Sequence, residues 1–130
     1  MYAHNEKWSY MVPVIFILDK NRDILSLIQR QLKSYGFTKI YSFTHPYQAI
    51  REMSRSVIPD LIITAYFLPV YNGIEFLNRI RDYYPEVNGI IYAASPEEFP
   101  GNCPYPATIL DVNNFEELFI MVKLLFSERG

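Results

Sequence analysis

The sequence has few of the features that mark secreted or membrane proteins. Its single cysteine, Cys103, excludes an intrachain disulfide, which fits a reducing cytoplasm. No apolar run approaches the roughly 18 residues that a membrane span requires. The first ten residues also lack the basic start and the apolar stretch of a secretory signal peptide. These absences predict a cytoplasmic protein that has no membrane partner.

An excess of positive charge is also missing. The 130 residues include 12 Lys and Arg and 14 Asp and Glu, which gives a formal net charge of −2, and the basic residues are scattered. Nucleic-acid-binding domains gather basic residues on one face, so we expect no nucleic-acid partner. Neither histidine, His4 or His45, is close to Cys103 in sequence, which makes a thiol enzyme a weak alternative.

Apolar and aromatic side chains, by contrast, are abundant, at 50% and 16% of the residues. Disordered chains lack such residues, and a domain of this length can bury a real core. We expect one domain over residues 13–129, preceded by an extension over residues 1–12. That extension docks on the domain, is disordered or contacts a partner, and its apolar residues include Tyr2, Trp8, Tyr10 and Met11.

Short apolar runs alternate along the chain with segments of helical spacing. The apolar runs predict strands at residues 13–18, 60–64 and 89–94, the alternation of residues 39–43 predicts another, and residues 108–110 are expected to form a short fifth strand. Helical spacing predicts helices at residues 21–35, 46–53, 73–84 and 113–129. Gly36 suits the end of the first helix, and Asn113 or Asn114 can cap the last. This alternation predicts an α/β fold, a doubly wound five-stranded parallel sheet with helices on both faces.

A proline-rich segment separates the last two predicted strands. Residues 95–106 contain four of the nine prolines. Prolines inside a helix remove hydrogen-bond donors and clash with the preceding turn. We therefore expect no regular helix here beyond one turn at residues 96–99, so that the fourth helix is shortened or lost.

Four segments, in order, resemble the receiver domain of bacterial response regulators over residues 13–126. They are PVIFILD with a helix that ends in YGF, PDLIIT, LPVYNG with IEFLNRIR, and DVNNFEEL before an apolar helix. The third is the most specific, because Pro69 and Gly73 lie four residues apart between a buried strand and an amphipathic helix. The resemblance implies a flavodoxin-like fold and a place in two-component phosphorelay signal transduction.

The chemistry of that family is almost wholly missing at the matching positions. The family uses an aspartate that accepts a phosphoryl group, two acids that hold Mg²⁺, a hydroxyl and a lysine. The matching residues here are Ala65 for the acceptor, Asp19 and Lys20 for the acids, Ala93 for the hydroxyl, Asp111 for the lysine and Thr108 for the aromatic switch. Alanine has no nucleophile, and one carboxylate is a poor Mg²⁺ site. We expect neither aspartyl phosphorylation nor a bound metal or other cofactor.

A lysine and an acid have exchanged places relative to the family pattern. Lys20 follows the first strand and Asp111 the fifth, and in the receiver fold both positions converge at the carboxyl end of the sheet. Two interpretations stay open: the side chains form an ion pair with Asp19 nearby, or both point into water. Tyr66, Phe67 and Tyr71 are expected to crowd or cap this crevice, the alternative being a ligand pocket with aromatic walls.

The last predicted helix has two apolar faces. The core-facing stripe consists of Phe115, Leu118, Phe119, Val122, Leu125 and Phe126. Ile120, Met121 and Leu124 project elsewhere. Receivers commonly dock partners or dimerise here, so this second strip is either an interface for a protein partner or homodimer, or a surface covered by Phe99, Tyr105 and the proline-rich loop.

The sequence therefore predicts a phosphorylation-incompetent receiver, or pseudo-receiver. It would not be an enzyme but a protein-interaction and regulatory module in bacterial signalling. One alternative is an active receiver that is phosphorylated at an unorthodox site. The other is a small-molecule sensor that uses the crevice near Asp19, Lys20, Tyr66 and Asp111.

Overall fold

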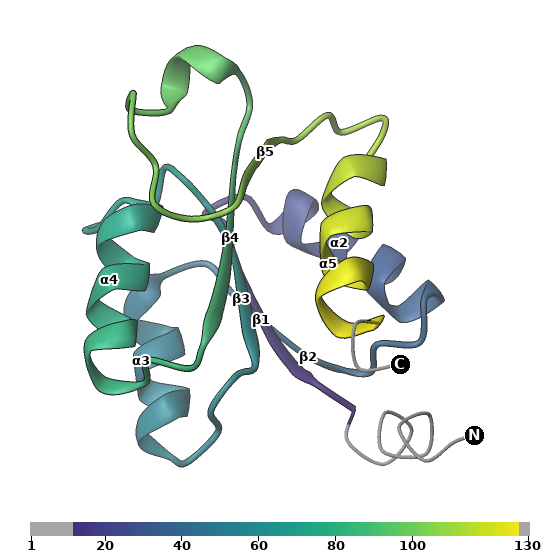
Figure 1. The fold of residues 1–130 in the computed structure, drawn as a ribbon. Helices are drawn as coiled ribbons and strands as arrows, with labels where there is room; N and C mark the ends of the chain where they lie inside the picture. Colours follow the sequence, from purple (N-terminus) through teal and green to yellow (C-terminus); the bar gives the residue numbers. More distant parts are fainter. Residues whose placement is uncertain (1–11, 128–130) are drawn as a thin grey trace.

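A computed structural model describes residues 12–127 as a five-stranded parallel sheet with the strand order β2-β1-β3-β4-β5 (Figure 1). The elements are β1 (Val14–Leu18), α2 (Arg22–Ser34), β2 (Lys39–Phe43), α3 (Pro46–Ser54), β3 (Leu61–Ala65), α4 (Gly73–Tyr83), β4 (Asn88–Ala93), the 3₁₀ turn η1 (Pro96–Glu98), β5 (Ala107–Ile109) and α5 (Glu116–Ser127). This confirms the predicted fold class, with η1 in place of the fourth helix. The apolar residues predicted in the extension, Tyr2 to Met11, lie outside the described residues.

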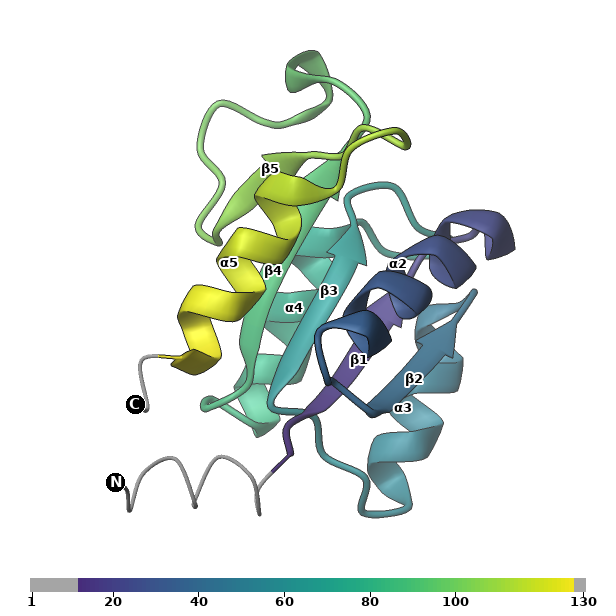
Figure 2. The same ribbon diagram turned by 90° about the vertical axis from the view of Figure 1, so that its right-hand side faces the viewer.

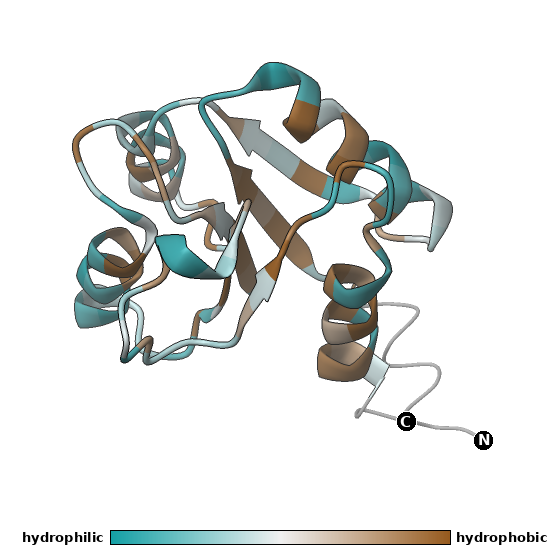
Figure 3. Cartoon of the chain, turned by 90° about the horizontal axis from the view of Figure 1, so that it is seen from above, coloured by the Kyte–Doolittle hydropathy of each residue, from teal (hydrophilic) through white to brown (hydrophobic). Residues whose placement is uncertain are grey.

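The helices cover both faces of the sheet. Figure 2 shows α2 and α5 in front of the strands and α3 and α4 behind them. Alternate strand residues feed two separate cores: Ile15 and Ile17 face α2 and α5, whereas Phe16 and Leu18 face α3 and α4. Figure 3 shows hydrophobic central strands, helices of mixed hydropathy and a largely hydrophobic α5. Burial on both faces explains why the central strands are apolar runs.

Local sequence sets the helix ends. The side chain of Asn21 accepts the N–H of Asp23 at 2.9 Å and so caps α2, which ends before Gly36 at a φ of +97°. Asn72 and Glu75 form a reciprocal capping box at the start of α4, with N–H···O distances of 2.8 and 2.9 Å. Within residues 12–127, none of the helices combines the length and the apolar character that a membrane span requires.

The predicted start of the last helix is wrong. The last helix begins at Glu116 rather than at residue 113, because Asp111 holds residues 111–114 in a turn: its side chain accepts the N–H of Asn113 and its carbonyl accepts that of Asn114. Asn114 nevertheless caps the helix start, accepting the N–H of Glu116 at 2.9 Å. In α3, the buried positions are Pro46, Ala49 and Met53, and Tyr47 is exposed.

Gly73 allows α4 to begin directly against the end of β3. Its N–H donates to the carbonyl of Tyr66 at 2.7 Å. A Cβ atom at this position would lie 2.7 Å from the carbonyl oxygen of Ala65, which is backbone and cannot swing away. The glycine of the sequence motif thus has a packing cause that is independent of any phosphoryl chemistry.

Replacing Gly73 with alanine should destabilise the domain by about 1–3 kcal/mol, the usual cost of forcing an extra methyl group into a packed site. Gly101→Ala is the matched control, because nothing lies within 4 Å of its Cβ position. Urea unfolding of both variants measures the difference. Equal stability of the two variants would contradict the close approach of α4 to β3.

Candidate functional site

A cavity of about 330 Å³ lies at the carboxyl end of the sheet. Doubly wound sheets bind their ligands at this end, beside the point where the strand order reverses. The cavity is lined by Asp19, Lys20, Ile24, Ala65, Tyr66, Phe67, Tyr92, Ala93, Ala94, Glu98, Leu110 and Val112. Four of the five residues that the sequence assigned to the degenerate phosphorylation pocket therefore come together, and Asp111 is the exception.

Lys20 and Asp111 do not form the ion pair that was one of the two open interpretations. Both side chains are exposed, and the Asp111 carboxylate instead accepts the N–H of Asn113 at 2.9 Å in the turn before α5. Among residues 12–127 the one ion pair joins Glu52 and Arg55, at 3.6 Å. Both residues are exposed, as the other interpretation expected, but the Asp111 carboxylate is also hydrogen-bonded within its own turn and Lys20 is among the residues that line the cavity.

Asp19 is buried at the end of β1, with both carboxylate oxygens engaged. Oδ1 accepts the N–H of Asn21 at 2.8 Å, and Oδ2 accepts the phenol hydroxyl of Tyr92 at 2.7 Å. Tyr92 lies on β4, and β3 separates β4 from β1. Since adjacent strands are about 4.8 Å apart, the phenol spans the end of β3 to reach the carboxylate.

Ala65 provides the space for this hydrogen bond. Ala65 and Tyr92 are direct partners in the register of β3 and β4, and both side chains belong to the core between the sheet and α2 and α5. A larger side chain at residue 65 would compete with the phenol ring in a closely packed region. The alanine at the acceptor position and the tyrosine beside it are therefore coupled features of one structure.

Tyr92 remains a neutral donor at ordinary pH. Burial, and to a smaller extent the charge of Asp19, raises the pKa of Tyr92 well above 10.0. The sequence analysis missed this residue. Its signal was a tyrosine within an otherwise apolar buried strand, directly before Ala93, the position that matches the family's hydroxyl.

The aromatic residues of the loop after β3 divide into two groups. Tyr66 and Phe67 line the cavity, with ring centroids 5.0 Å apart, and the ring centroid of Phe99 in the proline-rich loop lies 6.1 Å from that of Tyr66. Glu98 of the same loop accepts the N–H of Ala94 at 2.9 Å and so closes another side of the cavity.

Tyr71 does not line the cavity, which corrects the prediction made for it. A tight turn at Val70, where φ is 71° and the N–H of Tyr71 donates to the carbonyl of Pro69 at 2.7 Å, redirects the chain. Tyr71 then packs edge-to-face with Tyr47 of α3, with ring centroids 6.3 Å apart. The guanidinium carbon of Arg79 lies 5.3 Å from the centroid of the Tyr71 ring.

Thr108 occupies the aromatic-switch position of the family and is buried. Its hydroxyl hydrogen-bonds Glu117 in the first turn of α5. Thr108 is also the register partner of Tyr92, so it faces the same side of the sheet. This contact ties β5 to α5.

The second apolar strip of α5 is partly open. Ile120 and Leu124 are 43% and 56% exposed. The proline-rich loop turns toward α4 instead of folding over this strip, since the hydroxyl of Tyr105 donates to Asn78 at 2.6 Å. Tyr105 also borders a groove of about 410 Å³ that Met121 and Leu124 line from the α5 side.

The residues at the carboxyl edge fit Mg²⁺ poorly. Both oxygens of Asp19 already accept hydrogen bonds, and the next residue is a lysine. Hard cations prefer several oxygen ligands. Among residues 12–127 no group of three His, Cys, Asp or Glu side chains is arranged to hold a metal ion. The family's Mg²⁺ therefore has no matching donor set in this cavity.

Comparison with solved structures shows the same fold in several response-regulator proteins. TrrA from Thermotoga maritima, in complex with Mg²⁺-BeF, is 23% identical with a TM-score of 0.75, and the match covers 87% of this chain and 98% of that one. The BeF₃-activated receiver domain of DrrB is 20% identical, with a TM-score of 0.74 over 91% and 99%. The receiver domain of an HD domain-containing protein from Pseudomonas fluorescens is 24% identical, with a TM-score of 0.71 over 90% and 88%.

Sequence comparison gives the family directly. No curated protein sequence matches the chain. The sequence model of the response regulator receiver domain, however, matches residues 15–101, which is more than half of the chain. This match covers the strands from β1 to β4, the cavity residues between Asp19 and Glu98, and the packed glycine at the start of α4. The chain belongs to the response regulator receiver domain family.

Proposed function

We propose that this receiver domain does not accept a phosphoryl group and acts as a protein-interaction module in the cytoplasmic part of a bacterial two-component-type pathway. The observation that carries the proposal is the hydrogen bond between Asp19 and Tyr92 across Ala65. It occupies the place where the family's acceptor aspartate and acidic pair meet. The site thus lacks the nucleophile and has turned its remaining carboxylate into a structural group.

Nearby hydroxyl groups are poor substitutes for the missing aspartate. Tyr92 is 3% exposed and its pKa is raised, so its phenol is neither accessible nor readily ionised. Thr64 is fully buried, and its hydroxyl donates to the carbonyl of Ala65 at 3.0 Å. Without a reacting group the domain has no enzymatic step to perform, which supports a role in binding.

The exposed strip of α5 is the surface that best fits such a role. Ile120 and Leu124 lie one helical turn apart, and exposed apolar groups on adjacent turns form a continuous patch. The groove beside Leu124, bordered by Tyr105, extends this patch toward the proline-rich loop. We infer that a second copy of the chain or another signalling protein docks there.

A small-molecule sensor is a second candidate, supported by the cavity at the carboxyl edge. Its volume of about 330 Å³ falls in the range of ligand sites, and apolar side chains dominate its lining. Lys20 and Glu98 are charged groups beside its apolar walls and could orient a polar ligand. A thermal-shift screen with nucleotides and metabolites tests this candidate, and a saturable rise in Tm would support it.

Incubation of the chain with acetyl phosphate and Mg²⁺ should give no phosphorylated product, because residue 65 offers no carboxylate. Intact mass spectrometry measures the result. A receiver that keeps its acceptor aspartate, treated in parallel, controls for active reagent. A stoichiometric phosphate adduct on this chain would support an unorthodox active receiver instead.

Tyr92→Phe should destabilise the domain by about 1.5–3 kcal/mol, because it leaves an oxygen of the buried Asp19 carboxylate without its donor. Since the pKa of Tyr92 is raised in the folded state, the unfolded chain releases this proton first, and wild-type stability falls as pH rises above 10.0. The Tyr92→Phe variant has no phenol to titrate at this position, so its stability should fall less steeply at alkaline pH. Urea unfolding at neutral and alkaline pH measures both effects.

The matched control is Tyr83→Phe, which changes a tyrosine that is 79% exposed. It should leave the stability near neutral pH almost unchanged. If Tyr92→Phe were as stable as Tyr83→Phe, the Asp19–Tyr92 hydrogen bond would not be the element that holds this site together.

The wild type should self-associate at high concentration, and the double variant Ile120→Glu/Leu124→Glu should be a folded monomer, because buried carboxylates oppose an apolar interface. Light scattering with circular dichroism measures both properties. Tyr83→Glu, which places the charge on exposed α4, should associate like the wild type. A monomeric wild type at high concentration would rule out the homodimer.

A further inference from the structure

Strand β5 forms one edge of the sheet, because the strand order ends there and β5 pairs with β4 alone. Figure 1 shows it between the proline-rich loop and α5. An edge strand presents backbone N–H and C=O groups on its outer side, and such a row can pair with another strand. What matters for this edge is which residues direct these groups outward and whether anything in the chain satisfies them.

The hydrogen bonds to β4 identify the outward residues. The carbonyl of Pro106 accepts the N–H of Ile91 at 2.9 Å, and the N–H of Leu110 donates to a carbonyl of β4 at 2.8 Å. Successive residues of a strand direct their N–H and C=O groups to opposite sides. Ala107 and Ile109 therefore direct theirs away from the sheet.

These outward groups are almost wholly unused. Within residues 12–127 no hydrogen bond engages the backbone of Ala107 or the N–H of Ile109, and the Ile109 carbonyl has only a long contact of 3.5 Å with the Thr108 hydroxyl. Both residues are exposed. Thr108 faces α5, so the side chains of its two neighbours lie on the opposite face of the sheet, and the segment from β4 to β5 contains only the short turn η1.

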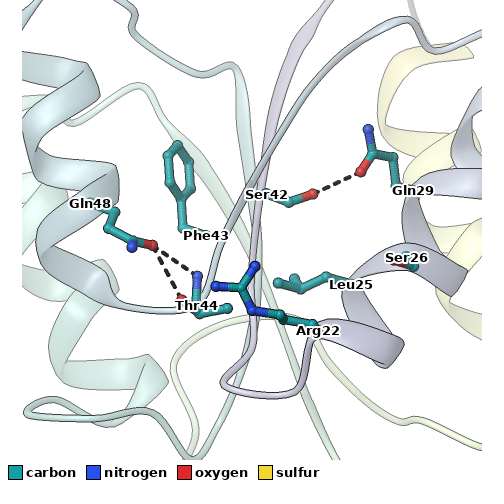
Figure 4. Close-up of a pocket in the computed structure, with 8 residues that line it drawn as sticks. All are labelled: Arg22, Leu25, Ser26, Gln29, Ser42, Phe43, Thr44 and Gln48. Carbon is teal, nitrogen blue, oxygen red and sulfur yellow. Dashed lines mark hydrogen bonds between the residues drawn. The ribbon is translucent and has the colours of Figure 1, made fainter.

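The opposite edge of the sheet is closed by side chains. The carbonyl of Phe43 bonds to β1, so the N–H of the next residue, Thr44, points outward. Figure 4 shows that Oε1 of Gln48 accepts this N–H, at 3.0 Å. Strand β2 also begins with the charged Lys39, and charged side chains on an edge oppose pairing with another strand. Strand β5, with the sequence ATI, has neither protection.

We propose that the outer edge of β5 pairs in the antiparallel direction with β5 of a second copy, which joins two sheets into one. A twofold axis at Thr108 places Ala107 of each copy opposite Ile109 of the other. Residues opposed in this way exchange N–H···O=C bonds in both directions. The outward groups of this strand are thus self-complementary. The inference rests on the homodimer of the proposed function and specifies the atoms that hold it.

The second apolar strip of α5 lies where it can add to this pairing. A three-residue edge makes few hydrogen bonds, and each contributes little net free energy in water. Leu124 shares a groove with Tyr105 and Pro106, which lead into β5, whereas Lys123 lies over the ring of Tyr35 on the α2 side, at 4.5 Å. A twofold axis perpendicular to the joined sheet keeps both α5 helices on one face, so their strips flank the junction.

Ile109→Pro tests the strand pairing. It removes one outward N–H from each copy and leaves the bonds between β5 and β4 in place, because edge strands tolerate proline where the N–H faces solvent. The Kd of self-association of the full chain, measured by analytical ultracentrifugation, should rise by about tenfold or more. Ile109→Val is the matched control: it keeps the N–H and a branched side chain and should associate like the wild type. Circular dichroism checks that both variants fold.

Hydrogen exchange of the wild type, followed by NMR, provides a measurement that needs no variant. The amides of Ala107 and Ile109 should exchange at least about tenfold more slowly at high than at low protein concentration. The amide of Thr108 faces β4 and should change little. Protection of Ala107 and Ile109 that does not depend on concentration would overturn the inference.

The outcomes separate this inference from the proposed binding role. If Ile109→Pro associates as tightly as Ile109→Val while Ile120→Glu/Leu124→Glu is monomeric, the strip dimerises without strand pairing, and only the inference drawn here fails. A wild type that stays monomeric overturns the strand pairing and the homodimer together, and leaves the docking of another signalling protein. If Ile109→Pro does not fold, the concentration dependence of hydrogen exchange decides.

Discussion

The buried carboxylate of Asp19 is the group on which the arrangement of the sheet's carboxyl edge depends. A buried charge is costly unless it is hydrogen-bonded, and here the two partners come from different elements. The Tyr92 hydroxyl donates to one carboxylate oxygen and so connects β4 to β1 across β3. The N–H of Asn21 donates to the other oxygen, and the side chain of Asn21 in turn caps α2. One carboxylate thus fixes the relative positions of two strand ends and a helix start, in the place where other receivers use a metal and a phosphoryl group.

This coupling lets the receiver fold stay closely packed without an aspartate at residue 65. The acceptor position holds Ala65, whose side chain is a single methyl group. Tyr92 on the adjacent strand fills the remaining space with its phenol ring. Restoring only an aspartate at residue 65 would place a second carboxylate beside Asp19 and against the ring of Tyr92, which combines like-charge repulsion with steric overlap. The absence of a carboxylate at residue 65 is therefore matched by the packing of three strands, and the proposed loss of phosphorylation does not rest on one missing residue.

Periodicity in the sequence predicts what depends on regular burial. The three central strands were predictable because burial on both faces makes them continuous apolar runs, and η1 was predictable because prolines disfavour a longer helix. Features that depend on local hydrogen bonds were harder to predict from the sequence. The turn held by Asp111 makes α5 begin later and keeps that side chain out of the cavity, and the turn at Val70 redirects Tyr71. Tyr92 was missed because its partner lies 73 residues away, and nothing in a single sequence pairs the two.

Helix α2 is the common wall of the two cavities at this edge. Ile24 lines the apolar cavity, while Arg22 and Leu25 line a separate, more polar cavity of about 350 Å³ at the end of β2, so the first turn of the helix lies between two chemically different spaces. The side chain of Asn21 caps that first turn, and the N–H of Asn21 donates to the Asp19 carboxylate. A ligand that stabilised either side would act on the same cap, and through Asp19 on Tyr92 and β4, which pairs with β5. The contact between Thr108 and Glu117 then continues from β5 to α5. The domain therefore keeps a physical connection from its carboxyl edge to its exposed strip without any phosphoryl group.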